Sequence, residues 1–99
     1  MLSDLRLPED LNRDISIAAE ILLENGCKEV YVFGSIAKGS FTAESDIDLA
    51  AVGLPKNRFF AAYGRIISKI HRHVDLVGLD YDTDFGDMLK QAGNLSRVA

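Results

Sequence analysis

Residues 46–79 constrain the fold most strongly, because they predict a strand, a helix and a second strand in immediate succession. Residues 46–52 and 73–79 are short and rich in aliphatic side chains, which is typical of strands. Between them, residues 56–70 predict a helix whose apolar side chains recur at helical spacing. The members of this apolar stripe are Phe59, Phe60, Tyr63, Ile66, Ile67 and Ile70. A strand, a helix and a strand in this order usually form a right-handed crossover between parallel strands of one sheet. The stretch therefore predicts a parallel strand pair with a helix packed on one face.

Shorter elements flank this crossover. We expect a helix at 8–25, where Pro8 suits the first turn and two acidic side chains follow it. Residues 29–33 predict a buried strand, which the short connection 34–45 can return antiparallel to the strand at 46–52. Further expected elements are a helical turn at 36–39, a short helix at 85–92 and a final strand at 95–98. The predicted fold class is α/β (α+β), a small mixed β-sheet with helices packed on it.

The length and composition fit one cytoplasmic domain, residues 1–99. Hydrophobic residues make up 47% of the chain and charged residues 26%, which is typical of a folded globular protein. The apolar runs are too short to cross a membrane, and residues 1–10 lack the apolar core of a signal peptide. The single cysteine, Cys27, cannot form an internal disulfide, and we interpret it as a small buried side chain rather than a nucleophile.

Charge is distributed unevenly along the chain. The net charge is −4, yet residues 49–74 contain basic side chains and no acidic one. The overall acidity argues against general nucleic-acid binding, which needs a basic surface, but not against a nucleotide, whose charge metal ions can neutralise. A basic helix face is predicted, which is either solvated or available to dock an acidic partner or attract ATP. Its members are Arg58, Arg65, Lys69 and Arg72.

Three aspartates are expected to gather at one edge of the sheet. Asp48 and Asp75 are each the third residue of neighbouring parallel strands, and Asp46 begins the first of these strands. Ionised carboxylates at close range repel one another and need a cation to stay charged. Oxygen ligands select hard ions, so the pattern predicts Mg²⁺, and two such ions can clamp the oxygens of an in-line phosphoryl displacement. The alternative is structural: Asp46 caps a strand and Asp48 forms a surface pair.

A glycine–serine turn is expected beside these carboxylates. The end of one strand meets the start of its antiparallel neighbour, so Gly34 and Ser35 are expected near Asp46. Gly34 has no Cβ and lets the backbone approach a phosphate. The Ser35 hydroxyl and the first N–H groups of the helical turn can donate to the same anion. Lys38 adds a positive charge, so the turn is suited to a polyphosphate.

Gly34-Ser35, followed after ten residues by Asp46-x-Asp48, resembles the signature of the DNA polymerase β-like nucleotidyltransferase superfamily. The stretches 33–50 and 73–77 resemble in particular the minimal nucleotidyltransferases (MNT), which are often paired with HEPN-domain proteins. The resemblance implies the nucleotidyltransferase (polymerase β-like) core fold. It also implies a reaction that moves AMP from ATP to a hydroxyl and releases pyrophosphate. In MNT–HEPN pairs the acceptor is a tyrosine of the HEPN toxin, and the MNT protein is the antitoxin.

The resemblance implies residue roles as well. Gly34 and Ser35 hold the triphosphate. Asp46 and Asp48 bind both magnesium ions. Asp75 holds the metal ion that activates the acceptor hydroxyl, or acts as the base for that hydroxyl.

Two positions depart from the family pattern. Ile36 stands where many relatives have arginine or another polar residue, and Lys38 stands where many have arginine. Lysine supplies charge to a triphosphate but not a bidentate fork. His71 and His73 also attract notice, but two histidines alone do not complete a metal site.

Two other functions stay open. The chain can be a non-catalytic antitoxin that neutralises its partner by binding. It can also be the catalytic subunit of a complex that modifies a small molecule such as an aminoglycoside. Because larger relatives use a second domain to hold the acceptor, we expect a partner protein to supply it within a homo- or hetero-oligomer. An exposed apolar area on the sheet or on the helix at 56–72 is expected to dock this partner.

Overall fold

The structure is a computed structural model that describes residues 7–42, 44–81, 84–92 and 95–99. In chain order its elements are α1 (Glu9–Glu24), β1 (Glu29–Phe33), α2 (Ser35–Lys38), β2 (Ile47–Val52), α3 (Lys56–Lys69), β3 (Val74–Gly78), α4 (Asp84–Ala92) and β4 (Ser96–Arg97). Within the described ranges, no helix combines the length and the apolar character needed to cross a membrane. We expect residues 1–10 not to form a signal peptide, and residues 1–6 of this stretch lie outside the described residues.

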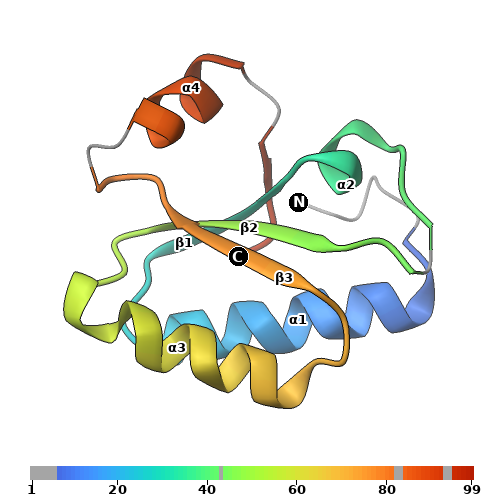
Figure 1. The fold of residues 1–99 in the computed structure, drawn as a ribbon, viewed down its shortest axis with the longest axis horizontal. Coiled ribbons are helices and arrows are strands. Elements are labelled where there is room, and N and C mark those ends of the chain that lie inside the picture. Colours follow the sequence, from blue (N-terminus) through green and yellow to red (C-terminus); the bar gives the residue numbers. More distant parts are fainter. Residues whose placement is uncertain (1–6, 43, 82–83, 93–94) are drawn as a thin grey trace.

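The strands form one mixed sheet in the order β3-β2-β1-β4 (Figure 1). β1 runs antiparallel to β2 and to β4, whereas β2 and β3 are parallel. The connection from β2 through α3 to β3 is therefore the parallel crossover that the sequence predicts. The predicted α/β (α+β) class is confirmed.

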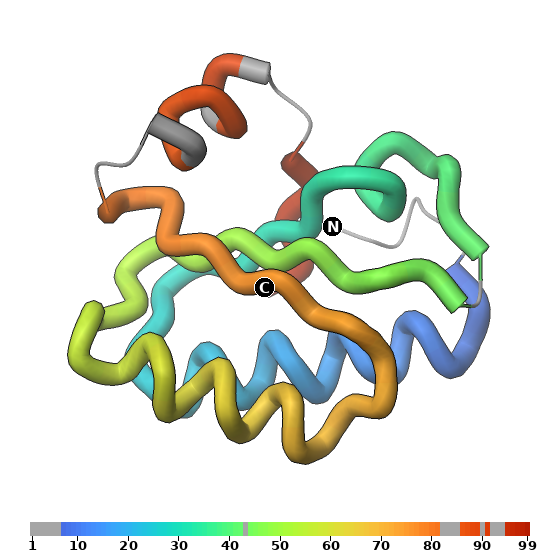
Figure 2. Tube along the Cα trace, in the orientation of Figure 1, coloured from blue at the N-terminus to red at the C-terminus, as the bar shows by residue number. Residues whose placement is uncertain are grey.

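The two faces of the sheet are covered differently. α1 and α3 lie on one face, and α2 and α4 lie over the other (Figure 2). The main core fills the space under α1 and α3, and its largest fully buried members include Leu11, Ile15, Leu22, Ile47, Leu49 and Ile66. On the opposite face a smaller cluster joins Phe33, Ala50 and Leu79 to Leu89 of α4. This second face is covered only in part, and the aspartates of β2 and β3 lie on it.

Several boundaries differ from the prediction by one or two residues. α3 ends before Ile70, because this residue has extended backbone (φ −120°, ψ 131°). β2 begins at Ile47, so Asp46 precedes the strand instead of opening it. The final strand is reduced to Ser96–Arg97, which pairs with β1.

The predicted apolar stripe of the second helix is partly wrong. Its members Ile66 and Ile70 are buried, but Phe60 is 81% exposed and Ile67 is 55% exposed. The reason lies in the sheet order, because β3 is an edge strand. Among the described residues, no further strand lies beyond β3 to cover the outer side of α3, so only the inner half of the stripe packs on the sheet.

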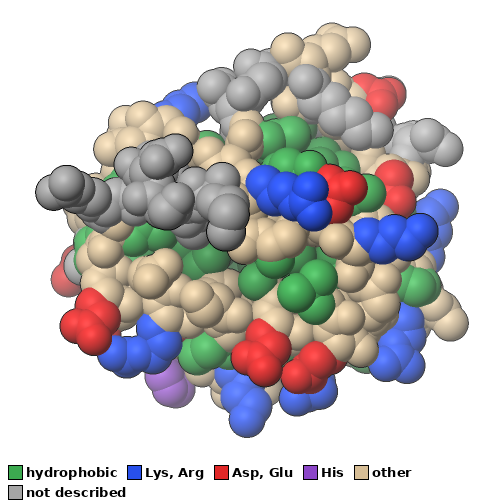
Figure 3. Space-filling model, turned by 180° about the vertical axis from the view of Figure 1, so that it is seen from behind, with side chains coloured by type: hydrophobic (Ala, Val, Ile, Leu, Met, Phe, Trp, Pro, Cys, Tyr) green, Lys and Arg blue, Asp and Glu red, His purple; other side chains and the backbone are tan. Residues whose placement is uncertain are grey.

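The predicted basic face is exposed to solvent at Arg58, Arg65 and Lys69, and its arginines also contact α1 or the residue that follows it. Arg58 donates to Asn25 Oδ1 at 3.0 Å, and Arg65 lies 3.7 Å from Glu24. Arg72, which follows α3, donates to an Asp14 oxygen at 2.8 Å. Acidic and basic side chains are interspersed on the face seen in Figure 3. Two of these arginines, Arg65 and Arg72, therefore have an acidic partner on α1 of the same chain.

Candidate active site

The sheet register sets Asp48 and Asp75 side by side. Phe33 of β1 pairs with Asp48 of β2, and Asp48 pairs with Asp75 of β3. Residues directly opposite each other on paired strands point to the same face. The three side chains therefore form one cross-strand row on the face that α2 and α4 leave partly open.

The two carboxyl groups interact directly. Burial raises the pKa of Asp48 above its ordinary value, and the negative charge of Asp75 and a hydrogen bond with Asp75 raise it further. Asp46 adds a smaller contribution in the same direction. The Asp75 side chain is about half exposed, and its Oδ1 lies 3.0 Å from His73 Nε2. A cation between these oxygens would relieve the repulsion that raises the pKa of Asp48.

Gly34 rests on the Asp48 carboxylate. Its backbone has φ 69° and ψ −143°, a region that only glycine adopts readily. A Cβ placed on Gly34 would lie 2.4 Å from Asp48 Oδ2, well inside van der Waals contact. Two constraints therefore require glycine at this position: the backbone angles and the space that the Asp48 carboxylate occupies.

The short helix α2 begins directly after this contact. Ser35 is its first residue, and the Lys38 N–H donates to the Gly34 carbonyl at 3.1 Å. Ile36 is fully buried in the main core, which explains why this chain has an apolar residue at this position. Ile36 fixes the helix to the sheet, while the Lys38 side chain is exposed. Ile36 thus anchors the short helix whose first and last residues are Ser35 and Lys38, directly after the glycine that contacts Asp48.

Asp46 stands somewhat apart from the other two aspartates. It is exposed and, with His71, His73 and Arg72, lines a cleft of about 360 Å³. Arg72 donates to the Ser45 carbonyl at 2.9 Å, so it supports the backbone directly before Asp46. In the described part of the chain, no group of three His, Cys, Asp or Glu side chains is arranged as a finished metal site. The Asp48–Asp75 pair supplies the hard oxygen ligands that Mg²⁺ prefers, with Asp46 near enough to affect Asp48 electrostatically.

Other residues of this site were not predicted. His73 approaches Asp75, and their spacing of two residues suggested a shared side of the chain but did not predict contact between the two side chains. A cavity of about 550 Å³, here called the site cavity, adjoins the two carboxylates. It is lined by Phe33, Asp48, Tyr63, Asp75, Leu76 and Val77. Tyr63 came from the predicted apolar stripe, and nothing in its spacing indicated that it would reach this cavity.

Comparison with known proteins identifies the family. The profile of the nucleotidyltransferase domain family matches residues 15–92. A toxin–antitoxin crystal structure with AMP-PNP is 24% identical, with a TM-score of 0.64 over 85% of this chain and 70% of that chain. The toxin–antitoxin MntA-HpeT with a tyrosine-to-alanine substitution is 24% identical, with a TM-score of 0.65 over 86% of this chain and 71% of that chain.

A putative nucleotidyltransferase from Sulfolobus solfataricus is 23% identical, with a TM-score of 0.50 over 93% of this chain and 87% of that chain. The search of curated proteins gave no match. At these identities the solved structures show the fold, and the family profile covers most of the chain. The chain belongs to the nucleotidyltransferase domain family and has the fold of the MNT-type nucleotidyltransferases.

Proposed function

We propose that this nucleotidyltransferase moves AMP from ATP to a hydroxyl of a partner protein, with a tyrosine as the first candidate acceptor. The partner is a toxin of HEPN type, and this chain is its antitoxin. Two of the similar structures are toxin–antitoxin complexes, and one of these contains AMP-PNP, which supports a nucleotide and a protein partner. The proposal places the reaction in the cytoplasm, where ATP and Mg²⁺ are available.

The observation that carries the proposal is the packing of Gly34 against Asp48, with Asp75 hydrogen-bonded to the same carboxyl. A phosphate-binding turn and a pair of hard oxygen ligands then share one site. We assign Asp46, Asp48 and Asp75 to two Mg²⁺ ions, which supply Lewis-acid stabilisation of phosphate oxygens. The donor set fits this ion, because all its ligands are carboxylate oxygens.

In the proposed reaction the acceptor oxygen forms a bond to the α-phosphorus of ATP. The bond between that phosphorus and the oxygen leading to the β-phosphate breaks, and pyrophosphate leaves. Asp75, the more exposed carboxylate, takes the proton of the acceptor hydroxyl. Gly34, Ser35 and Lys38 hold the triphosphate through backbone N–H groups, a hydroxyl and an ammonium group.

Label transfer from α-³²P-ATP tests this function. The chain is incubated with Mg²⁺ and with the protein that co-purifies with it from its host, and labelled protein is read after electrophoresis. Asp48→Asn and Asp75→Asn are expected to lower the transfer rate by about 100-fold or more. Asp87→Asn, an exposed acid on α4, is the matched control and is expected to leave the rate unchanged.

Two results would contradict the proposal. Transfer that survives Asp48→Asn shows that the label reaches the acceptor without this site. Absence of transfer, together with equal neutralisation of the partner by the parent and by Asp48→Asn, assigns the chain to a non-catalytic antitoxin instead.

A further inference from the structure

The outer edge of β3 has unpaired backbone groups. The Ile47 N–H donates to the His73 carbonyl, and the Leu79 N–H donates to the Ala51 carbonyl. Odd-numbered residues of β3 therefore turn their backbone groups toward β2, and the even-numbered residues between them turn theirs outward. Among the described residues, no hydrogen-bond partner is found for the N–H or the carbonyl of Leu76.

The structure already satisfies the outward carbonyls on both sides of Leu76. The Tyr63 hydroxyl donates to the Val74 carbonyl at 2.6 Å. The Tyr81 N–H donates to the Gly78 carbonyl at 3.3 Å. Among the described outward carbonyls of β3, the one without a partner is thus that of Leu76, one residue after Asp75.

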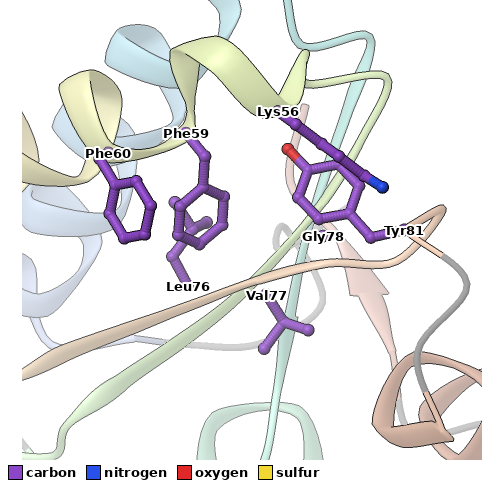
Figure 4. A pocket seen from close by; sticks show the side chains of 7 residues that line it. All are labelled: Lys56, Phe59, Phe60, Leu76, Val77, Gly78 and Tyr81. Carbon is purple, nitrogen blue, oxygen red and sulfur yellow. The ribbon is translucent and has the colours of Figure 1, made fainter.

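A groove of about 370 Å³ runs along this edge and is here called the edge groove (Figure 4). Its lining is Lys56, Phe59, Phe60, Leu76, Val77, Gly78 and Tyr81. Phe59 is at the centre of an aromatic cluster, with ring centroids 5.3 Å from Phe60 and 5.9 Å from Tyr81. Phe60 is 81% exposed. A large exposed aromatic side chain often marks a surface that a partner protein covers.

The edge groove is continuous with the proposed active site. Leu76 and Val77 line both the edge groove and the site cavity. Figure 4 shows Phe59, Phe60 and Leu76 on one side of β3 and Val77 on the other. Asp75, like Val77, points to the face that carries Asp48. A chain lying along this edge would therefore present alternate side chains to the aromatic groove and to the carboxylates.

We propose that an extended segment of the acceptor protein binds to β3 as an added strand. This inference rests on the proposed function and names how the protein acceptor is held. Backbone hydrogen bonds to Leu76 supply affinity, and one side chain of the segment packs on Phe60. The neighbouring side chain carries the acceptor hydroxyl and lies on the opposite face, opposite or diagonal to Asp75, about 4.5–8 Å away between Cβ atoms.

An extended segment fits this edge better than a helix does. A helix satisfies its backbone groups internally and would leave the N–H and carbonyl of Leu76 unpaired. An added strand satisfies both, and its side chains alternate between two faces as the groove and the carboxylates require. The exposed aliphatic side chain further along α3, Ile67, lines neither the edge groove nor the site cavity, so a strand on β3 does not need it.

The test uses a short fluorescein-labelled peptide in which threonine and valine alternate around one tyrosine, with a lysine at each end. Binding to the chain is measured by fluorescence anisotropy. Two further versions carry N-methyl groups on every second amide. The amides that are methylated in one version are unmethylated in the other. We expect one of these two peptides to bind about tenfold or more weakly and the other to keep its affinity, because only one set of amides faces β3. The Leu76 amide signal is expected to shift and to become protected from hydrogen exchange in nuclear magnetic resonance spectra.

Substitutions on α3 locate the site. Phe60→Glu is expected to weaken peptide binding by about tenfold or more, whereas Ile67→Glu, equally a charge on an exposed apolar position, is expected to change it less than about twofold. Both positions are exposed, so neither variant should lose its fold. No peptide binding, equal effects of the two methylation patterns or equal effects of the two substitutions would overturn the proposal. A dimer of the chain that Phe60→Glu dissociates would also overturn it, because the edge would then belong to a second copy.

The proposed function can fail separately. Peptide binding that follows the expected pattern, without labelling by α-³²P-ATP of either the peptide or the co-purifying protein, leaves the docking site in place and rejects the transfer reaction. Labelling of the partner protein that is unaffected by Phe60→Glu keeps the transfer reaction and rejects the docking site.

Discussion

Replacing Gly34 by alanine tests the contact between the glycine turn and the Asp48 carboxylate. The variant forces a Cβ into a backbone conformation with φ 69° and ψ −143°, at a cost of about 1–3 kcal/mol. The new methyl group would also lie 2.4 Å from Asp48 Oδ2 and 3.3 Å from its carboxyl carbon. Relieving that overlap moves a half-buried side chain and adds about 1–2 kcal/mol. We therefore expect Gly34→Ala to lower the free energy of unfolding by about 2–5 kcal/mol.

Gly39→Ala is the matched control. Gly39 also has a positive φ, 80°, but a Cβ there would meet nothing within 4 Å. Its cost is only the left-handed backbone, about 1–2 kcal/mol. Urea unfolding followed by circular dichroism measures the free energy of unfolding of both variants. The comparison is valid if the free energy falls with urea concentration at the same slope in each.

The double variant separates backbone strain from steric overlap. Asp48→Ala removes the oxygen and carboxyl carbon and leaves only a Cβ at 3.7 Å, which is ordinary contact. Gly34→Ala should then cost about 1–2 kcal/mol less in the Asp48→Ala background than in the parent. If Gly34→Ala costs the same in both backgrounds, the carboxylate does not occupy the space beside Gly34 and the proposed geometry of the site is wrong.

Three further predictions concern single side chains. Asp48→Asn is expected to raise the midpoint of thermal unfolding at pH 7 without metal ions. In the parent, the pKa of Asp48 is higher in the folded chain than in the unfolded chain. The parent therefore loses stability as the pH rises from the unfolded pKa through the folded pKa, and the advantage of the variant should vanish near pH 3. A constant advantage across a pH series would contradict this cause. Arg72→Gln removes a largely buried guanidinium from Asp14 and from the Ser45 carbonyl, and urea unfolding should show a loss of about 1–3 kcal/mol. The loss should be smaller in an Asp14→Asn background, where the contact with Asp14 is already gone. Fully additive losses would show that the pair is not coupled. Burial raises the pKa of Cys27, so Ellman's reagent should react at least about tenfold faster in urea than with the folded chain at pH 8; equal rates would place the thiol on the surface.

The site was predictable where backbone pattern alone decides position. Strand lengths and the parallel crossover put Asp48 opposite Asp75, and the short connection returned Gly34 to the same edge. These positions follow from periodicity two and from strand order, which the sequence expresses directly. The assignment of ions and nucleotide to these residues stays a prediction.

Features that depend on packing between distant elements were not predictable. An exposed apolar area was expected on the sheet or on this helix, but the apolar stripe of α3 did not reveal that Phe60 would be its exposed member, because helical spacing does not say where the sheet ends. The arginine face was predicted, but its acids on α1 depend on how the two helices lie together. The contact of His73 with Asp75 depends on side-chain torsion angles, which spacing leaves open.

The contact between Gly34 and Asp48 also sets an order in which the two positions can change over evolutionary time. While the carboxylate remains, no larger residue fits at position 34. Once the carboxylate is lost, the steric part of that restriction disappears. A descendant that kept only partner binding should therefore lose the aspartate at position 48 first and the glycine at position 34 afterwards. A chain with the glycine but without the aspartate would represent an earlier stage in the loss of catalytic residues.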